Sequence, residues 1–488
     1  MTREKNQLEN MEEIERNTEP KQKTKSKRKS DEKKEVDFTT GNIYKKMFMY
    51  SVPLLLGNLL QQIYFIADSI VVGQLIGKTA LAAVGAASSV TIILIFFFQG
   101  LCTGASIMIS QNIGAGKIER IKRIVIASSI IVFVLGGLCS IFGFFLTGNI
   151  LNWISVPKDI FDPTYRYLLV AVGGILPMLI YNMGAAILQA MGDSKTPLYY
   201  LAVASVINIV LDIVFVHNLN FGVESTAAAT VIAQFVAGIF IFITIQKRSE
   251  EIKNRVSAET YKASKDRISN IIKKILYLGF PIGVQQVVIH IANIVIQNHI
   301  NQIGTDAIAG WSIFCRIDTF VLLPYASFGI AIMNFTGQNY GAGKTKRIFE
   351  GVKAGMIMSI GVTWLISAIL CIFPEFFFNF FTKDPSVLEY ACQMIWCMVP
   401  GYALLAGAKV YSSAISGVGN AFIPMIINVL FMCVLRIVVL PIFTQIGGHN
   451  MTVLYWTFWL SWIVTFIVSL VYYRLRTKKQ LMKGYGMV

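Results

Sequence analysis

Long uncharged stretches recur along this chain, and their length constrains the fold more than any other feature of the sequence. The first runs from Met47 to Gly77, 31 residues in which Asp68 is the only charged side chain. An apolar stretch of about 20 residues is long enough to cross a bilayer as a helix. Comparable stretches follow it, so the sequence predicts an all-α polytopic membrane protein.

The composition agrees with this class of protein. Charged residues make up 14% of the 488 residues and hydrophobic residues 55%, whereas a soluble domain carries about 25% charged residues. The apolar stretches predict twelve membrane-spanning helices, near residues 46–77, 80–110, 121–148, 162–190, 196–217, 224–246, 270–301, 306–336, 349–381, 386–416, 421–445 and 451–473.

The net charge of +16 does not indicate a nucleic-acid partner, because of where the basic residues lie. Nine Lys and Arg residues fall in 247–274, and further basic groups fall in 117–123, in 344–347 and from Arg474 onward. The intervening connections carry few Lys or Arg, which matches the basic bias of cytoplasmic loops. We therefore expect both termini on the cytoplasmic side of the cell membrane, with residues 1–45 as a disordered tail.

The chain also contains an internal repeat. The sequence QNIGAGK at 111–117 returns as QNYGAGK at 338–344, 227 positions later, and Pro53 pairs with Pro281 at an offset of 228. Six spans per copy give both copies the same orientation. This predicts two six-helix lobes related by a pseudo-twofold axis along the membrane normal, with a cleft between them. The expected boundaries are 46–248 and 270–475 for the lobes, 249–269 for a cytoplasmic linker and 476–488 for a C-terminal tail.

Several polar side chains interrupt the spans of the first lobe. Gln61, Tyr64 and Asp68 share one helix face, and Asn208 and Asp212 lie four residues apart on another. An ionised carboxylate near the bilayer centre costs about 3 kcal/mol, so such residues face the bundle interior and are functional candidates. Both acids fall in the outer half of the lobe, where they can meet.

Two interpretations of these acids follow. The groups form a structural network between spans, or the two carboxyls share one proton and act as a proton carrier. We favour the second, because two acids exceed what hydrogen bonding requires. The predicted cation-coupling residues are Asp68, Asp212, Asn208 and Asn182.

The second lobe differs, because the residues that correspond by offset to the two acids are apolar. Together with residues of the first span, its polar side chains form the predicted substrate-binding set of Gln61, Tyr64, Asp68, Gln285, Gln286, His290 and Asn293. The predicted structural or gating residues are the pair Arg316 and Asp318, with Pro53 and Pro281. The spans carry no metal-ligand cluster and no Ser–His–Asp grouping. We therefore expect no enzyme, no metal site and no cofactor other than a coupling ion.

On these motifs the chain resembles the multidrug and toxic compound extrusion (MATE) family. The resemblance covers residues 45–475 and depends on SVPLLLGNLLQQIYFIADSIVVGQLIG, ALAAVG, GASIMISQNIGAGK, LQAMGDSKTP, NIVLDIVF, GFPIGVQQ and QNYGAGK. It implies two lobes in a V and export of amphipathic, often cationic drugs by exchange for H⁺ or Na⁺. It also implies a coupling acid in the first helix, as in prokaryotic members of this type.

Some features depart from that pattern or leave alternatives open. Other members of the family place essential acids in the second lobe, where this chain has Lys409 and, of the acids, only Asp318 in its eighth span. This favours H⁺ over Na⁺. The alternative function is a lipid-linked oligosaccharide flippase of the same superfamily, which would line the cleft with cations; only Arg316, Lys409 and Arg436 qualify. The expected partners are small-molecule drugs, organic cations and the lipid bilayer, and the expected state is a monomer.

Overall fold

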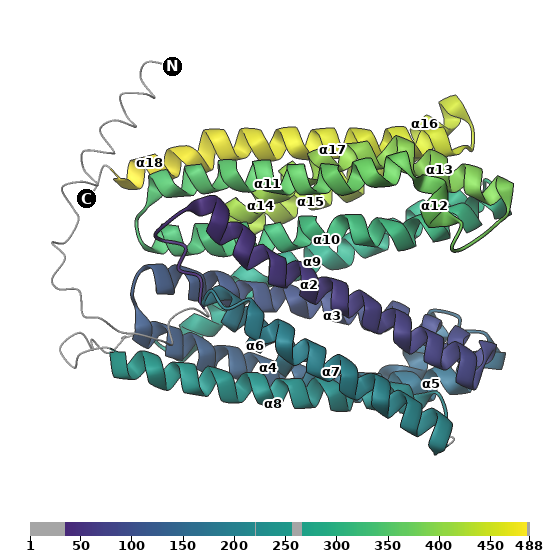
Figure 1. The fold of residues 1–488 in the computed structure, drawn as a ribbon, viewed down its shortest axis with the longest axis horizontal. Coiled ribbons are helices and arrows are strands. Elements are labelled where there is room, and N and C mark those ends of the chain that lie inside the picture. Colours follow the sequence, from purple (N-terminus) through teal and green to yellow (C-terminus); the bar gives the residue numbers. More distant parts are fainter. Residues whose placement is uncertain (1–34, 220, 256–265, 486–488) are drawn as a thin grey trace.

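The computed structural model describes residues 35–219, 221–255 and 266–485, and these residues are almost entirely helical (Figure 1). The helices of the first half are α2 (Ile43–Val71), α3 (Lys78–Gly114), α4 (Ile118–Trp153), α5 (Lys158–Gly173), α6 (Ile175–Ala190), α7 (Lys195–Ile213) and α8 (Glu224–Arg255). The helices of the second half are α9 (Ile268–Asn301), α10 (Thr305–Gly341), α11 (Thr345–Ile372), α12 (Pro374–Phe378), α13 (Pro385–Met398), α14 (Tyr402–Gly417), α15 (Phe422–Asn428), α16 (Leu435–Gly447), α17 (Met451–Tyr472) and α18 (Lys478–Tyr485).

The number of membrane spans agrees with the prediction. Within the described ranges, 11 helices are long and apolar enough to cross a membrane, or up to 12 if the bent pair α5 and α6 counts as one span. That pair bends by 45° at Gly174, where a Cβ atom would lie 2.0 Å from Cγ2 of Val231. A residue with a side chain would clash there, so glycine lets the bent span pack against α8.

Two spans of the second half are interrupted where the sequence predicted continuous helices. The span expected at 349–381 ends at Ile372, because Pro374 begins the short helix α12. The span expected at 386–416 contains a 3₁₀ turn, Val399–Gly401, with a proline at its centre. Proline has no backbone N–H to continue an α-helical ladder, which explains both breaks.

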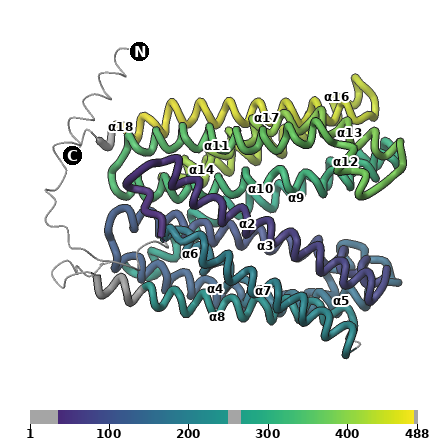
Figure 2. Tube along the Cα trace, viewed as in Figure 1, coloured from purple at the N-terminus to yellow at the C-terminus, as the bar shows by residue number. Residues whose placement is uncertain are grey.

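The two halves form two lobes, each with its own hydrophobic core. The first core includes Leu101, Ile124 and Leu188, and the second includes Met394 and Leu454. Figures 1 and 2 show the lobes as two layers of roughly parallel helices, purple to teal for the first and green to yellow for the second. The predicted all-α, two-lobe architecture is therefore confirmed.

The repeated motif forms the same turn in both lobes, and the two turns pack against each other. Gly116 and Gly343 have φ angles of +65° and +71°, a conformation that glycine adopts readily. Gly114 and Gly341 precede them, and each lies against the main chain of the opposite turn. A Cβ on Gly114 would lie 1.7 Å from the carbonyl oxygen of Gln338. We call this end of the molecule the turn end.

The ordered lobes extend beyond the predicted limits at both ends. Residues 1–34 of the expected tail lie outside the described residues. Residues 36–45 are instead ordered at the turn end, where the backbone N–H of Phe38 donates to Oε1 of Gln338 at 3.0 Å. At the other terminus, α17 continues through a π-helical segment, Tyr473–Thr477, into α18. Of the expected linker, residues 256–265 lie outside the described ranges.

Candidate cation-coupling site

Asp68 and Asp212 meet inside the first lobe. Asp68, on α2, is 8% exposed, and Asp212, on α7, is fully buried. Their carboxyl groups lie close enough to interact with each other. An ionised carboxylate has no hydrogen to donate, so a hydrogen bond between these two groups requires a proton on one of them. The structure therefore brings together the two acids that the sequence singled out.

The surroundings of this carboxyl pair offer few hydrogen-bond donors. Oδ1 of Asp68 and both carboxyl oxygens of Asp212 are buried and receive no hydrogen bond from an N–H or hydroxyl group of the described residues. Two ionised carboxylates in such a place repel each other, with no donor to offset the repulsion. A single positive charge, from a proton or from a bound cation, relieves it.

The hydroxyl of Thr230, on α8, connects the two helices that carry the acids. It accepts a hydrogen bond from the Tyr64 hydroxyl at 2.7 Å and one from the Asn208 side-chain amide at 3.3 Å, and it donates to the carbonyl of Thr226 at 3.1 Å. Tyr64 and Asn208 each precede an acid by four residues, about one helical turn. Thr230 thus helps to set the spacing of the pair. Thr230 is absent from the predicted site residues, because no spacing distinguishes this Thr from other helical Thr residues.

Both helices that carry the acids end in a π-helical segment. Val72–Ile76 follows α2, and Val214–Asn218 follows α7. The backbone N–H of Val72 donates to the carbonyl oxygen of Asp68, so the irregular segment begins within one turn of the acid. Single π-helical turns inside α-helices frequently lie at functional sites. Here the π-helical segments place backbone without the regular α-helical hydrogen bonds next to each acid.

A cavity of about 380 Å³ lies inside the first lobe beside the carboxyl pair. Its polar side includes Gln61, Tyr64, Asp68 and Asn182, all predicted site residues. Its apolar walls include Phe65, Leu94, Ile95, Ile175 and Met178. This volume falls in the range of small-molecule pockets, which are mostly apolar with a few placed polar groups. The arrangement suits a ligand with an apolar body and a positive charge.

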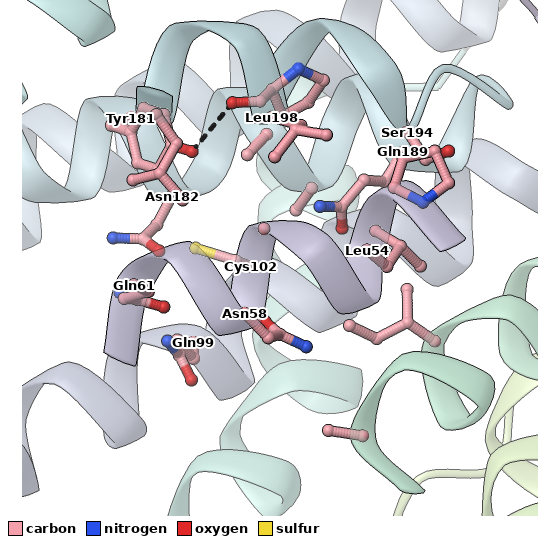
Figure 3. Close-up of a pocket in the computed structure, with 18 of the residues that line it drawn as sticks. Leu54, Asn58, Gln61, Gln99, Cys102, Tyr181, Asn182, Gln189, Ser194 and Leu198 are labelled. Atoms are coloured by element: carbon pink, nitrogen blue, oxygen red, sulfur yellow. Dashed lines mark hydrogen bonds between the residues drawn. The ribbon is translucent and has the colours of Figure 1, made fainter. Parts of the chain in front are cut away.

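A second cavity of about 240 Å³ adjoins the first, and Gln61 and Asn182 line both. Figure 3 shows these two side chains among those that line the second cavity. Its other amide side chains are Asn58, Gln99 and Gln189. The Asn182 amide donates to the carbonyl of Met178 at 2.8 Å. Asn182 therefore lies at the junction of the cavities and bonds its own helix, whereas Asn208 shares Thr230 with the network of the acids.

The predicted polar residues of α9 line neither cavity. Gln285 accepts a hydrogen bond from the Asn428 amide at 3.2 Å, inside the second lobe. The His290 ring stacks on Phe96 of the first lobe, with ring centres 4.4 Å apart. The remaining two predicted residues of this helix, one half-buried and one exposed, are Gln286 and Asn293.

Arg316 and Asp318, predicted as a structural or gating pair, form no ion pair with each other in the part of the chain that the structure describes. Residues two apart on a helix point to different sides, and the structure shows this. Arg316 is exposed, whereas the Asp318 carboxyl accepts a hydrogen bond from the Tyr402 hydroxyl. Asp318 therefore helps to join α10 to α14 inside the second lobe.

Pro53 and Pro281 lie inside α2 and α9 at buried positions. Each proline leaves one carbonyl of its helix without an N–H partner, so the helices can bend there. Pro53 also lines the second cavity. The two prolines thus occupy equivalent places in the two lobes, as the repeat predicted.

Two cationic side chains within the spans of the second lobe, Arg436 and Lys409, lie beside aromatic rings. The Arg436 guanidinium lies 4.1 Å from the ring centre of Phe458, and its Nε donates to the Ser461 hydroxyl at 2.8 Å. The Lys409 ammonium lies 5.3 Å from the ring centre of Tyr325. The two cations are therefore engaged with separate partners inside their own lobe.

The described residues contain no group of three or more His, Cys, Asp or Glu side chains placed to hold a metal ion. A Na⁺ ion at the carboxyl pair would therefore need amide or hydroxyl oxygens as further ligands. Oδ1 of Asn208, which is buried and has no donor, is one such oxygen.

Comparisons with known proteins agree with this architecture. The family model described as MatE matches residues 53–214 and 281–442, one stretch in each copy of the repeat. The chain is 27% identical over 404 residues to the probable multidrug resistance protein YpnP of Bacillus subtilis, covering 83% of this chain and 89% of that protein. It is 24% identical to the probable multidrug resistance protein NorM of Thermotoga maritima, covering 79% and 82%.

A solved structure shows the same fold. The outward-facing conformation of a multidrug resistance MATE family transporter of the MOP superfamily superposes with a TM-score of 0.84 at 22% identity. It covers 93% of this chain and 100% of that chain. The two chains therefore share the fold of a polytopic membrane protein built from two helical lobes. Because the family model matches both copies of the repeat and more than half of the chain, the protein belongs to the MatE family.

Proposed function

We propose that this protein is a secondary multidrug efflux transporter that exports amphipathic, often cationic compounds in exchange for H⁺. The observation that carries the proposal is the carboxyl pair Asp68–Asp212 beside the cavity of the first lobe. The names of the relatives, probable multidrug resistance proteins, support the substrate class. The same proposal places a monomer in the plasma membrane with both termini, and therefore the turn end, on the cytoplasmic side.

In this mechanism the proton and the exported compound compete for the first lobe. With Asp68 ionised, the cavity presents a negative charge beside apolar walls and attracts an amphipathic cation. A proton taken up from outside neutralises that charge and weakens the hold on the cation. The loss of charge also changes the contacts of α2 with α7. Coupling requires only that the proton and the compound stabilise different states of the transporter.

The contact between the two acids supports H⁺ over Na⁺. A hydrogen bond between two carboxyl groups needs one proton and no other ligand. A Na⁺ ion would need several oxygen ligands around it, and Asn208 supplies one candidate beside the two carboxylates. Na⁺ coupling through this site is therefore the alternative, and the experiment must distinguish it from H⁺ coupling.

The test is efflux from proteoliposomes that contain the purified protein and a fluorescent organic cation such as ethidium. One set carries an imposed pH gradient without Na⁺, and the other an imposed Na⁺ gradient at constant pH. We expect the pH gradient alone to drive ethidium transport. Transport driven by Na⁺ at constant pH, with none under the pH gradient, would contradict H⁺ coupling.

The flippase alternative has less support in the geometry. A pyrophosphate-linked substrate needs several cations that converge on one cleft, but Arg316 is exposed and Arg436 and Lys409 bind aromatic partners. One relative, 22% identical over 396 residues, is the FAD transporter of Shewanella oneidensis. The compound in the name of that relative is an anion. FAD in the same proteoliposomes is therefore the control for anion transport, and we expect it not to be carried.

A further inference from the structure

A short segment before the first helix crosses the turn end and binds the opposite lobe. We call residues 36–41 the strap. The backbone N–H of Phe38 donates to Oε1 of Gln338 at 3.0 Å. The carbonyl of Phe38 accepts from the Asn339 amide at 3.1 Å and from Nε of Arg347 at 2.8 Å. Three side chains of the second repeated turn and the helix after it thus hold one strap residue.

The rest of the strap is held through its main chain. Nη2 of Arg347 donates to the carbonyls of Thr40 and Gly41 at 2.6 and 2.8 Å, and Nζ of Lys344 donates to the carbonyl of Thr39 at 3.0 Å. These bonds are charge-assisted, the stronger kind of hydrogen bond in proteins. The second lobe therefore provides a built site for this piece of main chain.

One strap side chain fills a buried position between the lobes. Phe38 is fully buried, and its ring packs edge-on against Tyr50 at 5.0 Å and Phe335 at 5.5 Å between ring centres. The Tyr50 hydroxyl donates to the carbonyl of Gln189 in the first lobe at 2.7 Å. The strap therefore takes part in a packed junction to which both lobes contribute.

The start of the strap also touches the first lobe. The backbone N–H of Val36 donates to the carbonyl of Gly192 at 2.9 Å. The preceding residue, Glu35, forms an ion pair with Arg248 at 2.6 Å, and Arg248 also pairs with Asp193 at 3.2 Å. A Cβ on Gly192 would lie 2.4 Å from the carbonyl oxygen of Val36, so the chains are in close contact.

The repeat makes the same kind of contact in the reverse direction. At the offset of 228 that pairs the two helix prolines, Phe38 corresponds to Asp266, just before α9. Asp266 is held by the first lobe: Arg120 pairs with its carboxylate at 2.9 Å, and Nη1 of Arg123 donates to its carbonyl at 2.6 Å. Arg120 is the counterpart of Arg347 at the offset of 227. Each lobe therefore holds the segment that leads into the first helix of the other.

The first turns of α2 and α9 also pack against the opposite lobe. Met47 and Tyr50, near the start of α2, belong to a buried cluster with Phe335 and Val352 of the second lobe. Ile271, Ile275 and Leu278, near the start of α9, belong to the core of the first lobe. Separation of the lobes at the turn end must therefore strain or release these segments.

We propose that the strap and the segment at Asp266 are two reciprocal clasps that hold the turn end closed, and that the strap must leave Gly192 and Arg248 for that end to open. The strap clasp stays anchored on the second lobe, where it has more hydrogen bonds, and the contact with the first lobe is the part that breaks. The inference uses the cytoplasmic orientation of the turn end from the proposed function. It does not depend on which compound or ion is carried.

The experiment uses a cysteine that the chain already provides. Cys102 lines the second cavity at the boundary with α10, and it is 4% exposed. In a full-length variant that keeps Cys102 as its only cysteine, separation of the lobes at the turn end exposes this thiol. The rate of its labelling by a charged methanethiosulfonate reagent, added to inside-out membrane vesicles, reports the opening.

Arg347 makes three of the hydrogen bonds that anchor the strap on the second lobe, so without it the strap no longer ties that lobe to Gly192 and Arg248. We therefore expect Arg347→Ala to raise the labelling rate by about tenfold or more, roughly the factor that corresponds to loss of one charge-assisted hydrogen bond. Lys353→Ala removes the same charge from an exposed position of the same helix and is the matched control. Arg120→Ala should raise the rate less, because its clasp has fewer contacts. No rise for Arg120→Ala would overturn the reciprocal part of the proposal.

A second pair of variants separates the strap from the rest of the N-terminal segment. Deletion of residues 2–34 retains the strap and should label at the rate of the full-length protein. Deletion of residues 2–41 removes the strap and should label as fast as Arg347→Ala. If both Arg347→Ala and the longer deletion fold, as judged by gel-filtration profile, and label at the full-length rate, the strap is not a clasp. Because labelling needs no substrate, this result is independent of whether the protein exports drugs.

Discussion

Gly114 lies against the main chain of Gln338, so close that a Cβ atom on Gly114 would lie 1.7 Å from the Gln338 carbonyl oxygen. The reciprocal contact places Gly341 equally close to Gln111, where a Cβ would lie 1.8 Å from the carbonyl oxygen. The motif that suggested a repeat in the sequence is thus the place where the two copies touch. Its glycines are required by this contact between lobes as well as by the turn itself.

The first prediction concerns that contact. Gly114→Ala should destabilise the closed turn end by about 1–3 kcal/mol, the usual range for overpacking. Gly137→Ala is the matched control, because a Cβ at this position of α4 meets no atom within 4 Å. The measurement is the labelling rate of Cys102 from the turn end. Equal rates for the two variants would show that the turns separate without cost.

The second prediction concerns topology. The nine basic residues of 247–274 predict that this segment lies on the cytoplasmic side. The ion pair between Arg120 and Asp266 places the segment beside the turn end, so the two should share one side of the membrane. A cytoplasmic fluorescent reporter inserted after residue 260 should therefore be active, and one inserted between α5 and α4, at Pro157, should be inactive. The reverse pattern would overturn the proposed orientation.

Much of the fold was predictable because the bilayer imposes simple rules. Spans must be long, apolar and helical. The constant offset between the two QN-GAGK motifs predicted two lobes with the same number of spans. Breaks inside spans were harder. A proline such as Pro374 ends its helix, whereas Pro53 and Pro281 remain inside theirs, and only packing distinguishes the two cases. The ordered conformation of residues 36–41 could not be predicted, because it depends on contacts with Arg347, which lies about 300 residues away in the chain.

The site was predictable in part for a related reason. Asp68 and Asp212 stood out because a carboxylate in lipid is costly wherever it points. Thr230 carries no charge and has no such signal in the sequence. Its hydrogen bonds to Tyr64 and Asn208 could therefore be recognised only in the folded structure. For the polar residues of α9, residue type was the only signal in the sequence, and the structure places them away from the cavities of the first lobe.

The third prediction concerns Thr230. Thr230→Val keeps the shape but leaves the Tyr64 hydroxyl and the Asn208 amide without their acceptor, at about 1–3 kcal/mol for each buried group. Relaxation of these groups changes the spacing of the two acids, so the pH that gives half-maximal ethidium efflux should move. Thr230→Ser keeps the hydroxyl and should restore the original profile. Thr244→Val breaks a similar bond to Tyr200 elsewhere on α8 and should leave the profile unchanged.

The fourth prediction concerns Asp212. Asp212→Asn keeps an amide in the buried position and leaves Asp68 as the single carboxyl group. Efflux driven by a pH gradient should fall, but less than for loss of Asp68, because Asp68 lines the cavity and still titrates. Initial rates in proteoliposomes at matched protein levels measure this. Full wild-type efflux by Asp212→Asn would mean that the pair does not act as a unit.

The last prediction concerns Asp68. Asp68→Asn preserves the shape and an amide for hydrogen bonding, and it removes the titratable charge from the cavity. The variant should insert and fold, since an amide in the span costs less in lipid than a carboxylate. It should nevertheless lose gradient-driven efflux, and it should bind organic cations more weakly, because the negative charge beside the apolar walls is gone. Asp318→Asn is the matched control: it removes an acid of the second lobe that Tyr402 bonds, and it should retain efflux. Ethidium efflux and ethidium binding by the purified variants test both statements. Wild-type efflux by Asp68→Asn, together with its loss in Asp318→Asn, would move the coupling site to the second lobe.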